Sequence, residues 1–102
     1  MTRNDIMERR IIEEFEKVNH YNYILVGSTI DQEDNLILLT FEVHTPNVTG
    51  TVDIRATVGE QLTMNASYDN TALLDYSEIQ MQISEDLVGV CNAINTYYEI
   101  DG

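Results

Sequence analysis

The strongest constraint on the fold is a strict alternation of apolar and polar residues over positions 48–58. Valine, isoleucine and alanine fill the even positions from 52 onward, and threonine, aspartate and arginine fill the odd ones. Because successive side chains of a strand point to opposite faces, the pattern predicts a half-buried strand. A second alternating run, Leu62 to Tyr68, follows Gly59-Glu60, a pair typical of a hairpin turn with glycine first.

Two more strands are predicted upstream of this hairpin. Residues 21–29 are rich in aromatic and β-branched side chains, which favour strands. The polar stretch 31–35 predicts a turn, and residues 36–45 are apolar on both faces at first and then alternate. Pro46 ends this run, since proline cannot donate to a strand ladder. We therefore expect a four-stranded antiparallel meander.

A helix is predicted at each end of the chain. Near the N-terminus, apolar residues recur at helical spacing at Met7, Ile11, Phe15 and Val18, and Thr2 with Asp5 predicts the helix start, giving a helix over 3–19. Six apolar positions keep helical spacing after Ser77, namely Ile79, Ile83, Leu87, Val90, Ile94 and Tyr97. Residues 79–83 also fit a short fifth strand, but only three positions support it, so we favour the long helix.

These elements predict one α+β domain over residues 1–102, in the order αββββα. An antiparallel sheet with this order predicts two layers, with both helices packed on one sheet face. The predicted core consists of Phe15, Leu25, Leu38, Phe41, Val52, Ile54, Leu62, Leu87 and Ile94. The other sheet face is expected to be polar and to meet water or a partner, and it carries Thr51, Asp53, Arg55, Thr63, Asn65 and Ser67.

The charge of the chain is large and unevenly distributed. Eighteen acidic residues oppose five basic ones, for a net charge of −13. Four of the bases lie within residues 1–17, where five acids leave a net charge of −1; after that segment, Arg55 alone opposes thirteen acids. Such a field repels nucleic acid and anionic membranes and attracts basic surfaces. We expect no direct binding to DNA, RNA or a membrane.

Motifs for metals, cofactors or catalysis are weak. Asp31, Glu33, Asn35 and Glu42 match positions 1, 3, 5 and 12 of a calcium loop, but Leu36 replaces the required glycine, so an acidic hairpin turn is favoured. Cys91, the one cysteine, excludes an intrachain disulfide and has the spacing of a core residue. The sequence also contains no phosphate-binding loop or nucleophile elbow. We expect no cofactor, no enzymatic activity and, without a signal peptide or membrane-length apolar run, a cytoplasmic location.

The remaining candidate site is the acidic surface itself. Its predicted partner-binding residues lie in the 31–35 turn and around the start of the last helix: Asp31, Glu33, Asp34, Asp69, Asp75, Glu78, Glu85 and Asp86. Such carboxylates could imitate a phosphate backbone and occupy the basic surface of a nucleic-acid-binding protein. In size and charge alone, the chain resembles small acidic phage-encoded inhibitors of restriction and CRISPR systems.

Two other function classes stay open at this point. One is an acidic adaptor or chaperone-like module that dimerises and uses its sheet face. The other is an ordinary cytosolic domain whose surface charge serves only solubility. Position-specific effects of charge reversal would separate the first class from the last, because solubility depends on total charge.

Overall fold

The computed structural model describes residues 2–68 and 71–97, and it confirms the predicted α+β fold. The elements, in chain order, are α1 (Arg3–Glu16), β1 (Asn22–Asp31), β2 (Leu36–His44), β3 (Thr49–Val58), β4 (Leu62–Ser67), a short 3-10 helix η1 (Ala72–Asp75) and α2 (Ser77–Tyr97). Residues 79–83 belong to α2, so the long helix is confirmed and the fifth strand is not formed.

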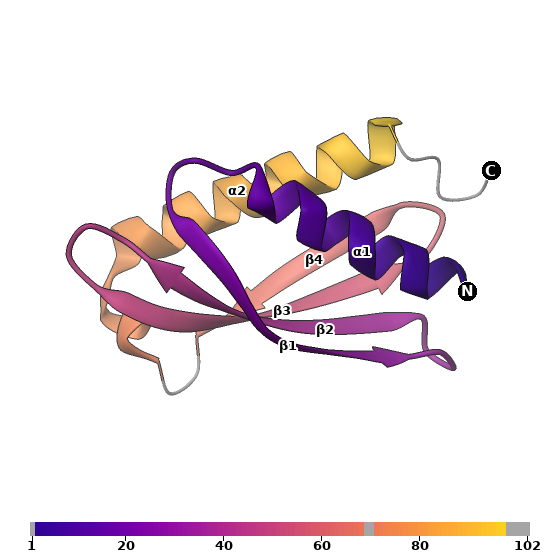
Figure 1. The fold of residues 1–102 in the computed structure, drawn as a ribbon, viewed down its shortest axis with the longest axis horizontal. Coiled ribbons are helices and arrows are strands. Elements are labelled where there is room, and N and C mark those ends of the chain that lie inside the picture. Colours follow the sequence, from indigo (N-terminus) through magenta and orange to yellow (C-terminus); the bar gives the residue numbers. More distant parts are fainter. Residues whose placement is uncertain (1, 69–70, 98–102) are drawn as a thin grey trace.

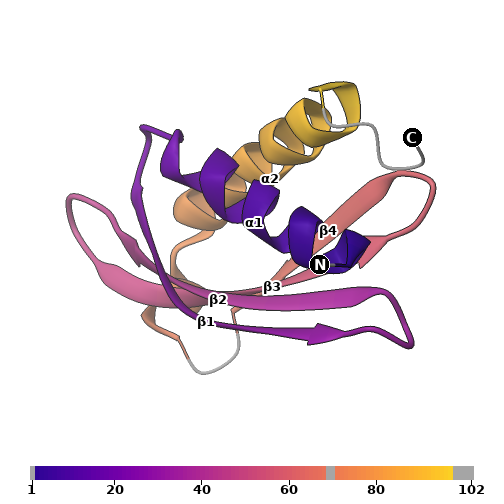
Figure 2. The same ribbon diagram turned by 45° about the vertical axis from the view of Figure 1, so that its right-hand side comes forward.

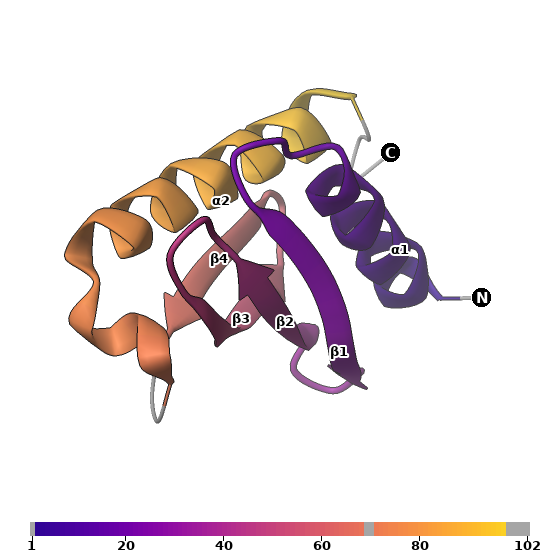
Figure 3. The same ribbon diagram turned by 60° about the vertical axis from the view of Figure 1, so that its left-hand side comes forward.

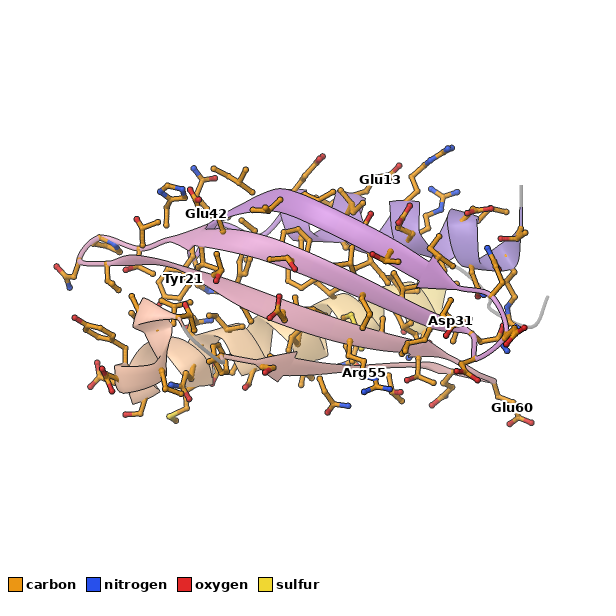
Figure 4. All side chains as sticks on the ribbon, turned by 90° about the horizontal axis from the view of Figure 1, so that it is seen from below. Glu13, Tyr21, Asp31, Glu42, Arg55 and Glu60 are labelled. Carbon is orange, nitrogen blue, oxygen red and sulfur yellow. The ribbon has the colours of Figure 1, made fainter. Side chains whose placement is uncertain are left out.

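The four strands form one antiparallel sheet in the order β1-β2-β3-β4. Both helices lie on the same face of this sheet, which makes the two predicted layers (Figures 1 and 2). α1 lies beside β1, and α2 runs along β4 (Figure 3). The opposite sheet face, seen toward the viewer in Figure 4, is not covered by either helix.

Hydrogen bonds around Thr2 explain where α1 begins. The Thr2 hydroxyl accepts from the Asp5 backbone N–H at 3.2 Å, and the Asp5 carboxylate accepts from the Thr2 backbone N–H at 3.0 Å. This reciprocal capping box satisfies two backbone donors that a helix start leaves free. The hydrogen bonds from Thr2, first its backbone and then its side chain, lower the pKa of Asp5. The helix ends at Glu16, three residues before the predicted end.

The core lies between the sheet and the helices and confirms seven of the nine predicted residues: Phe15, Phe41, Val52, Ile54, Leu62, Leu87 and Ile94. Its centre is an aromatic cluster in which the ring of Phe15 lies 5.0 Å from that of Tyr23 and 4.8 Å from that of Phe41. Because α1, β1 and β2 each contribute one ring, the cluster holds α1 against the sheet.

Leu25 and Leu38 are exposed, so their prediction as core residues was wrong. Leu38 alternates with the buried Ile37 and Leu39, and it therefore points to the open sheet face. Leu25 pairs with the buried Phe41, so it points toward the helix layer. It stays exposed because it lies on an edge strand, next to a bulge between Leu25 and Gly27.

The connection between β3 and β4 also differs from the prediction. Val58 pairs with Leu62, so the loop consists of the three residues 59–61 rather than two. None of the described glycines has a positive φ, which a two-residue turn with glycine first would require. The Arg3 guanidinium donates to the Gly59 carbonyl at 2.7 Å and ties this loop to the start of α1.

Candidate functional site

The first group of predicted partner-binding residues forms the turn between β1 and β2. Asp31, Glu33 and Asp34 are all exposed there. The Asp31 carboxylate accepts from the backbone N–H groups of Glu33, at 3.1 Å, and Asp34, at 3.3 Å. Both bonds go to the Asp31 Oδ1 atom, which thus organises the turn, as aspartate side chains commonly do. The turn predicted at residues 31–35 is confirmed, because this stretch connects β1 and β2 as a hairpin.

This acidic turn is fixed to the rest of the molecule by Asn4, a buried residue of α1. The Asn4 amide donates to Gln32 Oε1 at 3.0 Å and to Asn35 Oδ1 at 3.2 Å. Asn35 has a φ of 52°, and its carbonyl accepts from the Val58 N–H at 2.9 Å. The exposed acids of the turn are therefore presented on a backbone that is anchored from two sides.

The remaining predicted residues lie elsewhere along the molecule. Asp75 and Glu78 are exposed at the start of α2, which Figure 1 places at the end opposite the β1–β2 turn. Glu85 is exposed farther along α2, and Asp69 lies outside the described residues. Glu60, which the sequence did not single out, shares the Asp31 end of the sheet (Figure 4). The acids thus spread along the 41 Å long axis and do not form one patch.

These exposed acids lack a positively charged partner among the described residues. After Lys17 the chain contains one arginine or lysine, Arg55, and it lies on the open face of the sheet (Figure 4). Among the described residues, arginine or lysine forms ion pairs in Arg10–Glu13, at 3.5 Å, and Lys17–Glu14, at 2.9 Å. Both of these pairs lie in or next to α1, the part of the chain that holds four of the five arginine and lysine residues.

Asp86 was predicted as one of the exposed partner-binding acids, but it is buried. The residue is only 5% exposed. Its Oδ2 accepts from the Tyr23 hydroxyl at 2.6 Å, whereas its Oδ1 lies 2.9 Å from His20 Nδ1 and accepts from the Gln82 side-chain amide at 3.1 Å. Three partners thus satisfy a carboxylate that would be costly to bury alone. It cannot serve as a partner-facing charge.

The sequence contained a signal for the burial of Asp86. The residue follows Ile83 by three positions and precedes Val90 by four, which places it on the buried stripe of α2. Asn4 carries the same signal, three positions before the buried Met7. A polar residue on an apolar stripe predicts a buried polar contact.

The Asp86 cluster joins three parts of the fold, because Tyr23 lies on β1, Gln82 on α2 and His20 just before β1. Burial, and then the hydrogen bond to Asp86, raises the pKa of Tyr23 far above its usual value. The phenol therefore stays protonated and donates to the carboxylate. Burial also raises the pKa of the neighbouring Tyr21, with smaller contributions from the charges of Asp86 and Glu78.

An imidazole held by a carboxylate is also the arrangement of a general base. His20 and Asp86 border an open cavity of about 390 Å³, together with residues of α1 and α2. Within the described residues, however, no hydroxyl or thiol is hydrogen-bonded to His20, and no three histidine, cysteine or acidic side chains converge to hold a metal ion. The hydrogen bonds of the cluster link α2 to β1 and to the segment before β1.

The open sheet face is less polar than predicted. Arg55 lies between its cross-strand neighbours Leu38 and Asn65, and Asp53 accepts from the Thr40 hydroxyl at 2.7 Å. Leu38, however, is exposed here, and so is Ile24, whose partner in the ladder is the outward-facing Glu42. A cavity of about 390 Å³ opens between β2, β3 and β4. The face thus combines charged and polar residues with scattered apolar side chains.

Comparisons with known proteins identify no family, relative or similar structure for this chain. No protein-family model matches the chain, and searches of curated proteins and solved structures find no significant match. In the part of the chain that the structure describes, neither helix has the length and apolar character needed to cross a bilayer.

Proposed function

We propose that this chain is a non-enzymatic binding protein that occupies the basic, nucleic-acid-binding surface of another protein. The observation that supports this most directly is the lack of compensation: the exposed acids of the β1–β2 turn and of α2 have no cationic partner among the described residues. Uncompensated carboxylates are available for charge-assisted hydrogen bonds to arginine and lysine.

The spread of these acids supports imitation of an extended polyanion rather than of a single phosphate. They occur in the β1–β2 turn and at the start of α2, at opposite ends of a molecule 41 Å long, and Glu85 adds an exposed charge farther along α2. One strand of duplex DNA places a phosphate about every 3.4 Å along its axis, so this length corresponds to roughly twelve phosphates. A basic channel that binds DNA could therefore be covered over a comparable length.

The mechanism we propose is steric and electrostatic. The carboxylates take the phosphate positions on the partner and exclude its nucleic acid, with no catalysis and no cofactor. Small acidic inhibitors of restriction and CRISPR systems act on targets of this kind. We place this action in the cytoplasm, where such partners work and where the single free cysteine, Cys91, would stay reduced.

The proposal is tested by capture followed by competition. The immobilised chain is exposed to a lysate of the cells that carry its gene, the bound protein is identified, and a fluorescent DNA duplex is added to the purified complex. We expect the two ligands to exclude each other. We also expect Kd to rise steeply with salt, as the Debye length falls from about 10 Å at 0.1 M to about 3 Å at 1 M.

Charge reversals separate a specific surface from bulk charge. Glu78→Lys with Glu85→Lys should raise Kd about 100-fold or more, since each charge contact that is desolvated in a complex contributes roughly 2–5 kcal/mol. Glu8→Lys with Glu16→Lys in α1 changes the net charge equally and should have a much smaller effect. Equal losses in both variants, or a complex that resists 1 M salt, would contradict phosphate imitation.

A further inference from the structure

The sheet has two edge strands, β1 and β4. They differ in whether their outer backbone groups are hydrogen-bonded to other parts of the chain. An edge strand exposes unpaired N–H and C=O groups that can pair with a strand of another chain. Natural proteins usually block such edges with side chains, charges, proline or bulges. The contrast between the two edges therefore indicates which of them is left available.

The β4 edge is blocked by side chains of α2. The Asn95 side chain accepts from the Leu62 N–H at 2.8 Å and donates to the Leu62 carbonyl at 3.1 Å, which reproduces the pairing of a neighbouring strand. Burial raises the pKa of the Cys91 thiol, and a hydrogen bond with the Met64 backbone acts in the opposite direction. The outer backbone groups of Leu62 and Met64 in β4 are thus hydrogen-bonded by side chains of α2 in the same chain.

The β1 edge has no comparable cover. Apart from the ladder to β2, no hydrogen bond of the described residues uses a backbone group of β1. Its ten residues include no proline and no charge before Asp31. Ile24, Leu25 and Val26 are all exposed, and the last is 61% exposed. The bulge between Leu25 and Gly27 limits the available segment to Asn22–Val26.

The charge distribution favours a second copy of this chain on the β1 edge. Residues 1–30, which contain α1 and β1, have a net charge of −1, whereas the remaining residues carry −12. Two copies would repel each other at most orientations, because like charges raise the energy of association. This repulsion should be smallest on the side formed by α1 and β1, which lie next to each other in Figure 3. There the exposed apolar residues of one edge would meet those of the other.

We propose that the protein forms a two-fold symmetric dimer in which Asn22–Val26 of β1 pairs antiparallel with the same segment of a second copy. The pairing joins two four-stranded sheets into one and covers Ile24, Leu25 and Val26 in both copies. Because of the two-fold axis, the apolar residues of the segment in one copy contact the same apolar segment of the other copy. The dimer does not depend on the proposed phosphate imitation, because it uses the uncharged edge.

Sedimentation equilibrium over a range of concentrations tests the dimer, with a lysine substitution on the edge and a matched one on α2. Val26→Lys adds a charge to the edge, whereas Val88→Lys makes the same change at a residue that is 58% exposed on the outer surface of α2. We expect the wild type and Val88→Lys to reach twice the mass of one 11.7 kDa chain. Val26→Lys should raise the dimer Kd at least about tenfold, because each dimer loses two apolar contacts.

Salt gives an independent readout that separates this proposal from the proposed function. Dimerisation between two acidic copies should strengthen as salt screens their repulsion, whereas binding to a basic partner should weaken. Circular dichroism spectra of both variants should match that of the wild type, which checks that a change in mass does not reflect unfolding. A wild type that stays monomeric at about 1 mM, a weak limit for specific association, would overturn the proposal. Equal dimerisation of the Val26 and Val88 variants would also overturn it, since the contact would then lie elsewhere.

Discussion

Removing the hydroxyl of Tyr23 tests whether the Asp86 cluster stabilises the fold. In Tyr23→Phe the buried carboxylate loses its shortest contact, the 2.6 Å hydrogen bond to the phenol, while the aromatic packing against Phe15 and Phe41 is kept. A hydrogen bond to a charged group contributes about 1.5–3 kcal/mol. Against a typical total stability of about 5–15 kcal/mol, the loss is large. For a domain of this size it corresponds to a decrease in Tm of roughly 10 °C.

Urea unfolding monitored by circular dichroism measures this difference, with Tyr21→Phe as the matched control. Tyr21 is half-buried near the same carboxylate, but no hydrogen bond of its hydroxyl is found in the described residues. Its substitution should change the free energy of unfolding by no more than about 0.5 kcal/mol. If both variants unfold at the same urea concentration as the wild type, the Asp86 cluster contributes nothing to stability and our reasoning fails.

Two further outcomes are expected. The raised pKa of Tyr23 contributes stability that is fully present below the ordinary tyrosine value of 10.0 and is lost as the pH rises above it. The free energy of unfolding from urea titrations should therefore fall from pH 9 to pH 11, with a slope from this group of at most about 1.4 kcal/mol per pH unit. This slope should be smaller in Tyr23→Phe, and an unchanged slope would contradict the assignment. Gly50→Ala should destabilise by about 1–3 kcal/mol, because its Cβ would lie 2.8 Å from Leu73 Cγ and from Thr71 Oγ1. Gly27→Ala, whose added Cβ meets no atom within 4 Å, should be nearly neutral, and urea unfolding of both variants measures the difference.

The parts of the fold that could be predicted from the sequence are those in which the apolar residues fit only one repeat, either that of a strand or that of a helix. Alternation in β3 and helical spacing in α2 each agreed over several residues, so both elements were assigned correctly. In β2, by contrast, the run from Leu36 to Leu39 is apolar on both faces. Phe41 and Val43 point into the core, and counting back two residues at a time along the strand reaches Leu39 and not Leu38. This alternation would have excluded Leu38 from the predicted core.

The candidate site was harder to predict because charge alone does not indicate exposure. Asp86 was grouped with Glu85 as its neighbour in sequence, although adjacent residues of a helix point about 100° apart. The exposure of Leu25 depends on β1 being an edge strand, which no local pattern encodes. Likewise, the separation of the acidic turn from the start of α2 follows from the path of the whole chain.

The pairing of each strand with its neighbours in the sequence has a consequence for folding during synthesis. Once residue 44 has left the ribosome, α1, β1 and β2 can already assemble around Phe15, Tyr23 and Phe41. The apolar face of β3 and β4 stays uncovered until α2, which follows them in the chain, has been synthesised. During that interval it is exposed to aggregation. The acids at 31–34 and Glu60, which precede α2 in the chain, would keep nascent copies apart during that interval.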